Sequence, residues 1–393
     1  MAATEPAIAQ RSILFVVSVD WFFLSHRLRL AERLLAEGWE VAVAAPQEDP
    51  DSPSKFNGVG VQFIPLKMRR GYSSPFSELR AIRELFRLYQ RLSPSVIHHV
   101  AIKPVIYGSI AARLAGQNTV VNAVSGLGYT FLGKGPIAWA KKFAIRTLYQ
   151  FALRGSPAIT VFQNQEQLDL FIKNGILREE NTALIKGAGV DLERFGGTGP
   201  VPNNHKVLFA SRILKSKGIP ELVEAIRILR ESDCPVELLV AGRIDSKNPD
   251  SIAESQLDAW SAEGLITWLG YREDITELLA EARLAVLPSH SEGLPRSLLE
   301  AAAAGRPIIA TDIAGCREIA RDRTNARLVP VKDATALAAA MADLLGDFDS
   351  CEKFGVQGRT LAAEFSDSYV IAKTRNVYEN LLEKNSIPTS ASS

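Results

Sequence analysis

Cysteine and histidine are scarce in this chain, and neither is arranged as a set of ligands. Its 393 residues include three cysteines, Cys234, Cys316 and Cys351, which lie far apart without C-x-x-C spacing, and five histidines without an H-E-x-x-H pattern. Structural zinc sites and disulfide frameworks depend on such spacings, so we expect neither, and three isolated thiols fit a reducing compartment.

Long apolar segments are also missing. The first residues, MAATEPAIAQRS, lack the apolar core of a signal peptide and carry an acid at Glu5. The longest uncharged window runs from Leu114 to Gly133, but glycine, serine, glutamine and asparagine residues interrupt it. A bilayer would not favour such a segment, so we expect a cytoplasmic protein without a transmembrane helix.

Several motifs of nucleotide-binding proteins and hydrolases are absent. The loop after the first apolar run, DWFFLS, contains no G-x-G-x-x-G, and Gly126-Leu127-Gly128 lacks the third glycine. The chain has no P-loop and no G-x-S-x-G nucleophile elbow. Metal-dependent sugar transfer often uses an Asp-x-Asp pair. Of the two here, Asp49-Pro50-Asp51 lies in a proline-rich turn and Asp347-Phe348-Asp349 follows a helix, so we interpret both as surface turns.

Acidic residues are missing from one long window. No Asp or Glu occurs between Glu84 and Glu166, whereas nine Lys and Arg residues do. Residues 1–195 hold 23 Lys and Arg against 16 Asp and Glu, and residues 196–393 hold 22 against 28. The first half therefore presents a positive field, which favours an anionic partner.

Short apolar runs alternate with helix-like segments along the chain, as in α/β proteins with parallel sheets. Residues 12–19 and 41–45 are typical of strands, with a loop expected at 20–25 and a helix at 26–37. The stretch 196–204, GGTGPVPNN, is the best candidate linker. We expect a Rossmann-like domain at 12–195, a second one at 205–365, a helix at 366–384 and a disordered tail at 385–393.

Two helices of the first domain carry distinctive surfaces. The helix predicted at 78–92 has Arg80, Arg83, Arg87 and Arg91 along one side, which indicates a solvated face or, alternatively, a membrane or partner surface. The helix predicted at 136–153 combines aromatic residues with Lys and Arg and has no acid. It fits an interfacial helix on anionic lipid, with a partly buried core helix as the alternative.

The stretch that starts at Ala285, AVLPSHSEGLPRSLLEAAAAGRPIIATDIAGCREI, is typical of two successive strand, loop and helix units. Glu292 in the loop and Glu300 two turns into the helix can face one cleft at the carboxyl end of a parallel sheet. Helix N-termini near Pro295 and Gly315 favour a phosphate or diphosphate there. Together these features suit a nucleotide sugar. Ordinary surface glutamates are the alternative.

Candidate cations follow the ends of other predicted strands. Arg212 and Lys217 lie in the loop after the strand at 206–210, where they would neutralise a departing diphosphate without a metal, or serve as ordinary surface charge. His98 lies near the end of the strand at 96–100 and Lys103 follows it. Such positions hold ligand contacts in α/β proteins, although a packed, hydrogen-bonded histidine is the alternative.

Six segments give the chain a resemblance to a known family. They are VSVDWFFLSHRL at 17–28, IKPVIYGSIAARLAG at 102–116, NAVSGLGYTF at 122–131, GAGVDLERF at 187–195, SRILKSKG at 211–218 and EGLPRSLLE at 292–300. Together they resemble the family-4 retaining glycosyltransferases of the GT-B fold, in the bacterial branch that builds O-antigen, capsule or exopolysaccharide units on undecaprenyl diphosphate. The resemblance implies two Rossmann-like domains facing a cleft, with a C-terminal helix that crosses back to the first domain.

The resemblance also implies roles for matching residues. Glu292 would contact the hydroxyls of the donor sugar and Glu300 those of the ribose, while Arg212 and Lys217 would hold the diphosphate. Many relatives carry a histidine at the position of Val100, so part of its role would fall to His98, His99 or Lys103. Further donor contacts are implied at Gly293, Leu294, Pro295, Val190 and Gly315, and at Arg272 near the base.

We therefore expect a retaining glycosyltransferase that moves a hexose or N-acetylhexosamine from a UDP-sugar to a polyprenyl-diphosphate-linked glycan, without a metal or cofactor. Its partners would be the nucleotide-sugar donor, the lipid-linked acceptor and an anionic membrane surface, and not nucleic acid. It would lie peripherally on the inner face of the cytoplasmic membrane. A UDP-N-acetylglucosamine 2-epimerase, which shares the fold, and a non-catalytic sugar-nucleotide-binding module are the alternatives.

Overall fold

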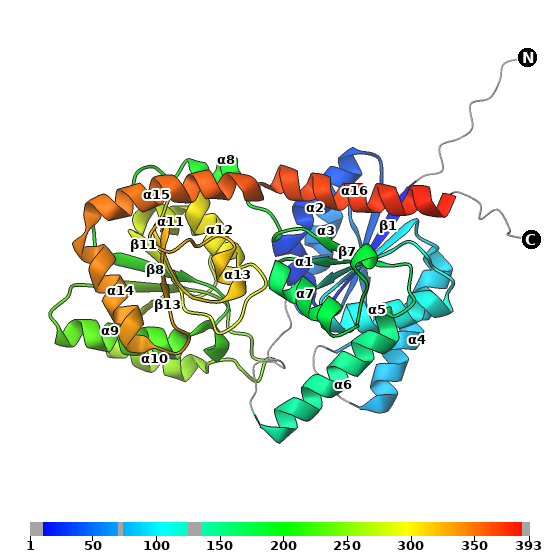
Figure 1. Ribbon diagram of the computed structural model, residues 1–393, viewed down its shortest axis with the longest axis horizontal. Coiled ribbons are helices and arrows are strands. Elements are labelled where there is room, and N and C mark those ends of the chain that lie inside the picture. The colour runs from blue at the N-terminus through cyan, green and yellow to red at the C-terminus, as the bar shows by residue number, and fades with distance from the viewer. Residues whose placement is uncertain (1–10, 70–73, 125–134, 387–393) are drawn as a thin grey trace, which may run out of the picture. The chain divides into compact units, whose positions relative to one another are not determined.

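The computed structural model describes residues 11–69, 74–124 and 135–386. These residues form two compact units, of which unit 1 comprises residues up to 185 together with 371–386, and unit 2 comprises residues 186–370. Each unit is built on a parallel β-sheet with helices packed against it (Figure 1). The fold is therefore α/β with two Rossmann-like units, as the sequence predicts.

The sheet of unit 1 has the strand order β3-β2-β1-β4-β5-β6-β7. Its strands are β1 (Ser12–Val17), β2 (Glu40–Ala45), β3 (Gln62–Pro65), β4 (Val96–Val100), β5 (Val120–Val124), β6 (Ile159–Phe162) and β7 (Thr182–Leu184). The helices are α1 (Asp20–His26), α2 (Leu28–Ala36), α3 (Ser52–Gly58), α4 (Pro75–Leu92), α5 (Ile102–Leu114), α6 (Pro136–Leu153), α7 (Gln165–Lys173) and the short η2 (Glu179–Asn181).

The sheet of unit 2 has the order β10-β9-β8-β11-β12-β13. Its strands are β8 (Lys206–Ala210), β9 (Glu237–Ala241), β10 (Thr267–Trp268), β11 (Leu284–Leu287), β12 (Ile308–Thr311) and β13 (Ala326–Val329). The helices are α8 (Leu192–Gly196), η3 (Lys215–Lys217), α9 (Ile219–Glu231), α10 (Glu254–Ala262), α11 (Ile275–Glu281), α12 (Arg296–Ala303), α13 (Ala314–Arg317), α14 (Ala334–Gly346), α15 (Phe348–Ala362) and η4 (Ala363–Phe365). A last helix, α16 (Asp367–Ser386), follows.

Both sheets reverse their direction of growth next to their first strand. In unit 2 the chain adds β9 and β10 on one side of β8 and then returns to place β11 on the other side, and β1 has the same position between β2 and β4 in unit 1. Every residue of β4, β5, β11 and β12 is buried, because helices cover both faces of a parallel sheet. In α/β sheets, ligands bind at the carboxyl edge next to such a reversal.

Helix α1 occupies residues 20–26, where the sequence predicts a loop. The buried carboxylate of Asp20 accepts hydrogen bonds from three backbone N–H groups, one of them that of Trp21 at 2.8 Å, so the helix starts directly after β1. The helix breaks at Arg27, whose φ and ψ are −131° and −4°, and resumes as α2. The predicted helix at 26–37 is therefore the second of two short helices.

The predicted linker at 196–204 lies inside unit 2. The buried guanidinium of Arg306 donates hydrogen bonds to the carbonyls of Thr198 at 3.0 Å and Pro200 at 2.7 Å, and Arg359 donates to the carbonyl of Gly199 at 2.6 Å. These bonds fasten the glycine-rich stretch to its own unit. The chain passes between the units near residues 185 and 370 instead.

The C-terminal helix crosses back to unit 1, as the family resemblance implies. Residues 371–386 of α16 belong to unit 1, and the helix lies beside α2 (Figure 1). The hydroxyl of Tyr378 lies 2.5 Å from Nδ1 of His98 on β4, and Arg375 forms an ion pair of 2.8 Å with Glu37. Unit 1 is therefore completed by residues that follow unit 2 in the sequence.

Candidate functional site

The loops after β8 and β11 are packed directly against each other in unit 2. The backbone N–H of His290 donates to the carbonyl of Ser216 at 2.8 Å. Gly218 has a φ of +77°, and a Cβ atom there would collide with the carbonyl of Pro288. Only glycine combines this left-handed backbone with so close an approach, so Gly218 fixes the β8 loop against the β11 loop at the reversal point of the sheet.

Lys217 and Glu292 form an ion pair across these two loops. Their side chains retain only 14% and 11% of their exposure, and the hydroxyl of the buried Ser289 donates to the same carboxylate oxygen at 2.6 Å. The hydroxyl of Thr311, at the end of β12, donates in turn to the Ser289 carbonyl. Three strand ends therefore position one charge pair, which is the preorganisation that a binding site for a polar substrate needs.

Gly315 lies where the next loop meets the β11 loop. A Cβ atom at this position would lie 2.5 Å from the carbonyl oxygen of Glu292 and 2.6 Å from that of Gly293. The short helix α13 thus starts against the backbone of the β11 loop. Cys316, the next residue, is fully buried, and burial together with the charge of Glu292 raises the pKa of its thiol, so it stays protonated and is not a nucleophile.

Glu300 lies on the second turn of α12 and pairs with Arg296 on the first turn. The Arg296 Nε atom lies 2.8 Å from the Glu300 carboxylate, which retains 13% exposure. Burial raises the pKa of Glu300, and the charge of Arg296 limits that rise. Glu292 and Glu300 therefore have different partners, a lysine from the β8 loop and an arginine from the same helix.

Two other predicted cations are also paired with acids. Arg212 lies 3.4 Å from Asp245, which follows β9, and keeps 39% of its side-chain exposure. Arg272, after β10, donates through Nε to Asp274 at 2.7 Å, and this bond raises the pKa of Arg272. Both pairs lie in loops at the carboxyl ends of strands, as Lys217 and Glu292 do.

Sequence reasoning missed an aromatic residue beside these pairs. Tyr271 is 56% exposed, and the guanidinium of Arg243 lies 4.6 Å from the centre of its ring. Both residues follow strand ends, in the segments AGRID and LGYRED, and that position is the signal that would have found them. An exposed ring with a cation over it resembles a platform for stacking a planar group.

The remaining predicted donor contacts are largely structural. Leu294 is 7% exposed and packs near Gly187, and Pro295 is the residue that precedes α12. Val190 is 1% exposed, and its N–H and C=O both bond to the backbone of residues 365–367, at 3.0 Å each. These side chains are packed inside the protein. A ligand would therefore contact backbone groups and the neighbouring charged side chains.

The two predicted histidines of unit 1 are core residues. His99 is fully buried between the Tyr89 hydroxyl and the Asn122 side chain, at 2.8 Å each, and burial lowers its pKa to about 4. His98 is 1% exposed on the opposite face of β4. Burial, and then the charge of Arg27, lower the pKa of His98 well below its usual range, so both rings are neutral near pH 7.

Val100 is the last residue of β4, and Lys103 lies in the first turn of α5. Lys103 forms a 2.8 Å ion pair with Glu78 and donates to the carbonyl of Arg69 at 3.0 Å, while Val100 is fully buried. Ala101 between them has φ of +79° and ψ of 168°, a backbone conformation that is almost confined to glycine. The structure does not bring His98, which bonds to Tyr378, together with Lys103. The motif Gly126-Leu127-Gly128 lies outside the described residues.

Helix α6 exposes a row of aromatic side chains. Trp139, Phe143 and Phe151 are 68%, 57% and 63% exposed, and the rings of Trp139 and Phe143 stack with their centres 5.7 Å apart. Arg146 is exposed on the same helix, whereas the side chains of Lys141 and Lys142 lie outside the description. Among the helices that the structure describes, none is both long and apolar enough to span a bilayer.

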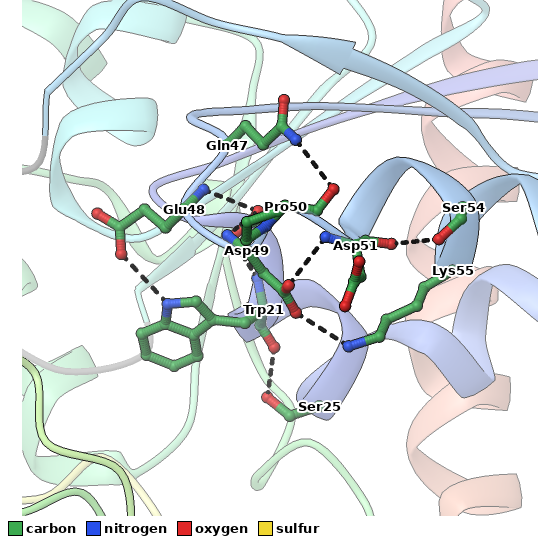
Figure 2. Close-up of polar contacts among 10 residues, drawn as sticks. Trp21, Ser25, Gln47, Glu48, Asp49, Pro50, Asp51, Ser54 and Lys55 are labelled. Carbon is green, nitrogen blue, oxygen red and sulfur yellow. Dashed lines mark hydrogen bonds and ion pairs between the residues drawn. The ribbon is translucent and has the colours of Figure 1, made fainter.

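The two Asp-x-Asp pairs have local partners. Asp49 pairs with Lys55 at 3.0 Å and accepts from the N–H of Asp51, just before α3 (Figure 2). Asp347 caps α15 and accepts from the N–H of Ser350 at 3.0 Å. Within residues 11–69, 74–124 and 135–386, no three His, Cys, Asp or Glu side chains gather as a metal site.

Comparison with known proteins identifies the family of each unit. The model described as Glycosyl transferase 4-like matches residues 12–164, and the model described as Glycosyl transferases group 1 matches residues 204–347. The sucrose-phosphate synthase of Thermosynechococcus elongatus has the same fold, with a TM-score of 0.76 at 20% identity over 95% of this chain and 100% of that chain.

Two curated relatives match most of the chain. One is the N,N'-diacetylbacillosaminyl-diphospho-undecaprenol alpha-1,3-N-acetylgalactosaminyltransferase of Campylobacter jejuni, with 26% identity over 92% of this chain and 98% of that protein. The other is the UDP-Gal:alpha-D-GlcNAc-diphosphoundecaprenol alpha-1,3-galactosyltransferase of Escherichia coli, with 22% identity over 80% of this chain and 82% of that protein.

Two Rossmann-like units and a C-terminal helix that returns to the first unit give the chain the GT-B fold. A glycosyltransferase family model matches each unit, so the protein is a glycosyltransferase. With one glycosyltransferase model matching each unit, the chain belongs to the family-4 glycosyltransferases.

Proposed function

We propose that this glycosyltransferase moves a hexose or N-acetylhexosamine from a UDP-sugar to a polyprenyl-diphosphate-linked glycan, with retention and without a metal. The names of both curated relatives specify acceptors on undecaprenyl diphosphate, and one specifies UDP-galactose as donor. The observation that carries the proposal for this chain is the Lys217–Glu292 pair at the reversal point of the unit 2 sheet.

The proposed chemistry uses the charges of unit 2. Lys217 and Arg212 stabilise the negative charge that develops on the departing diphosphate, together with the positive end of the α12 dipole. Glu292 accepts hydrogen bonds from hydroxyls of the transferred sugar, and Glu300 accepts them from the ribose. The acceptor hydroxyl attacks the anomeric carbon from the side on which the diphosphate leaves, through an oxocarbenium-like transition state, and its proton passes to the departing diphosphate. The new bond then has the stereochemistry of the old one.

We further propose that unit 1 docks on an anionic membrane surface through α6. An exposed row of aromatic residues beside an exposed arginine suits the headgroup region, where rings enter the acyl boundary and cations meet lipid phosphates. A lipid-linked acceptor would be reached from that surface. Sedimentation with liposomes of anionic lipid should capture the protein, and the double variant Trp139→Ser and Phe143→Ser should remain in solution. Equal capture of both proteins would refute the docking surface.

The transfer itself is tested by a donor screen against a bacterial membrane lipid extract, read by UDP release and product mass. Lys217→Ala and Glu300→Ala should each lower the rate about 100-fold or more, as expected for groups that act on the leaving group and donor. The matched controls Lys353→Ala and Glu352→Ala change exposed residues of α15 and should retain the rate. Unchanged release in the first pair would refute the proposal.

A further inference from the structure

Lys217 lies at the end of a single turn of 3₁₀ helix, η3, in the loop after β8. Such a turn leaves its first backbone N–H groups without a partner inside the turn. The N–H of Lys217 bonds to the carbonyl of Leu214 at 3.1 Å. The N–H of Gly218 bonds to the carbonyl of Lys215 at 2.9 Å. The N–H groups of Lys215 and Ser216, which come first in the turn, therefore need acceptors from other parts of the chain.

Asp250 supplies both acceptors from the segment between β9 and α10. Its carboxylate accepts from the N–H of Ser216 at 2.9 Å, and its own carbonyl accepts from the N–H of Lys215 at 2.9 Å. Asp250 is only 7% exposed, and burying a carboxylate is costly unless donors satisfy it. Asp250 thus caps η3, although it lies 34 residues from Ser216 in the sequence.

The segment that carries Asp250 is itself paired with the β8 loop. Ile244 forms a parallel bridge with Ile213, and Ser251 forms an antiparallel bridge with Leu214. One bridge precedes Asp250 in the sequence and the other follows it. The position of the Asp250 carboxylate beside η3 is therefore set by backbone pairing, and not by the side chain alone.

The β11 loop holds Ser216 through its other backbone group. The carbonyl of Ser216 accepts from the N–H of His290 at 2.8 Å. The His290 ring lies 3.0 Å from the carboxylate of Glu221 in the first turn of α9, and the two side chains retain 14% and 19% of their exposure. Ser216 is therefore bound through its N–H by the β9 segment and through its carbonyl by the β11 loop, and Lys217 comes directly after it.

We infer that Asp250 is a positioning residue, which fixes the direction of the Lys217 side chain by holding the backbone of Ser216. The inference rests on the proposed role of Lys217 at the diphosphate of the donor. A displacement of about 1 Å is enough to remove much of the effect of a group that must meet its ligand in one geometry. In this role Asp250 contacts no substrate.

Hydrogen exchange and UDP binding, both measured on the full chain, test the inference without any turnover. Asp250→Ala removes the cap, whereas Asp250→Asn removes the charge but keeps an oxygen that accepts from Ser216. Asp258→Ala is the matched control, because Asp258 is an exposed acid on the helix that follows, α10. Mass spectrometry measures the amide exchange of residues 214–218, and calorimetry measures the dissociation constant of UDP.

In Asp250→Ala, amides of residues 214–218 should exchange at least about 10-fold faster, and UDP should bind at least about 5-fold more weakly, as expected for the loss of a helix cap. Asp250→Asn should stay within about 2-fold of the wild type, because asparagine caps helices as well as aspartate does. Asp258→Ala should not differ from the wild type in either measurement.

A double-mutant cycle with Lys217→Ala shows whether the effect on UDP passes through Lys217. In the Lys217→Ala background, Asp250→Ala should weaken UDP binding by less than about 2-fold. An equal loss in both backgrounds, unchanged exchange in Asp250→Ala, or an Asp250→Asn variant as impaired as Asp250→Ala would overturn the inference. Should Asp250→Ala not fold, Asp250→Glu, which keeps the charge but displaces the oxygens, replaces it with the same expectations.

The proposed transfer fails in ways that these measurements distinguish. A wild type that binds UDP but transfers no sugar to a lipid acceptor would refute the transfer and leave the test of Asp250 intact. A wild type that binds no UDP would refute the proposed donor. Amide exchange of residues 214–218 in Asp250→Ala and Asp250→Asn would then decide by itself whether Asp250 fixes the turn.

Discussion

The two units share one architecture and use their carboxyl edges differently. Unit 2 places ion pairs at the edge, such as Lys217 with Glu292, in loops that several strand ends hold together. Unit 1 buries its strand-end histidines, His98 and His99, inside the core, and at its edge presents an indole and acids around Trp21. The comparison teaches that position at a strand end predicts proximity to a site, whereas burial and charge decide whether a side chain serves chemistry or packing.

The sharpest test of this difference is a double-mutant cycle in unit 2. Glu292→Gln and Lys217→Met should each lower the transfer rate about 100-fold, because each leaves a partly buried charge unpaired and removes one of the contacts that we propose to the donor. The double variant should be less impaired than the product of the two effects. Rates measured by UDP release would contradict the pairing if the two effects multiplied.

The buried histidines of unit 1 should affect the stability of the protein and its pH dependence rather than the rate of transfer. The pKa of His99 is about 4 in the folded protein and about 6.5 in the unfolded protein. Between these pH values, His99 is protonated in the unfolded state and neutral in the folded state. The free energy of unfolding should therefore fall by about 3 kcal/mol from this residue between pH 7 and pH 4.

Urea denaturation at several pH values measures how much of this loss of stability is due to His99. His99→Gln should lose less stability on acidification than the wild type, whereas His205→Gln, a change at an exposed position, should follow the wild type. Identical pH dependence in all three proteins would show that His99 accepts a proton in the folded state.

Gly315→Ala would test the close packing of the unit 2 loops. The new methyl group must displace the carbonyls of Glu292 and Gly293, a cost of about 1–3 kcal/mol for overpacking that should appear as weaker UDP binding and a lower melting temperature. Gly346→Ala adds the same group where nothing lies within 4 Å, and it should leave both quantities unchanged. Calorimetry with UDP and thermal unfolding measure the two effects.

The smallest effect should come from Arg296→Ala. Removing this partner takes away the largest opposition to burial, so the pKa of Glu300 should rise further and the carboxylate should be lost at a higher pH. The acidic limb of the pH–rate profile should move upward, with a loss of rate near pH 6 that is larger than the loss near pH 8. A profile that is lowered uniformly would show that Arg296 acts on the fold instead.

Much of the architecture follows from local sequence. Strands such as β11 and β12 are uninterrupted apolar runs, which only a sheet covered on both faces can bury. Lys217 and Glu292 were predicted separately, in two loops at strand ends, and their ion pair depends on the sheet order that makes these loops neighbours. Local apolar patterns therefore predict the helices and strands, whereas the site depends on which strands are neighbours in the sheet.

Other features depend on contacts with residues that are distant in the sequence, so local patterns do not predict them. The stretch 196–204 has the composition of a linker, yet Arg306 and Arg359, more than a hundred residues later, fasten it to unit 2. The segment at 20–25 is a helix because Asp20 accepts hydrogen bonds from its own helix and from residues 48 and 49. His98 lies near a strand end, where the sequence predicts a ligand contact, but it is buried and hydrogen-bonded to Tyr378 of α16.

The bond between His98 and Tyr378 spans 280 residues of sequence. At a synthesis rate of about 5–20 residues per second, Tyr378 is made roughly 14 to 56 seconds after His98, so the nascent first unit waits that long without the helix that packs on His98. An incomplete chain is then a natural client for a chaperone at the ribosome, and a frameshift late in the gene would damage the earliest part of the protein to be made.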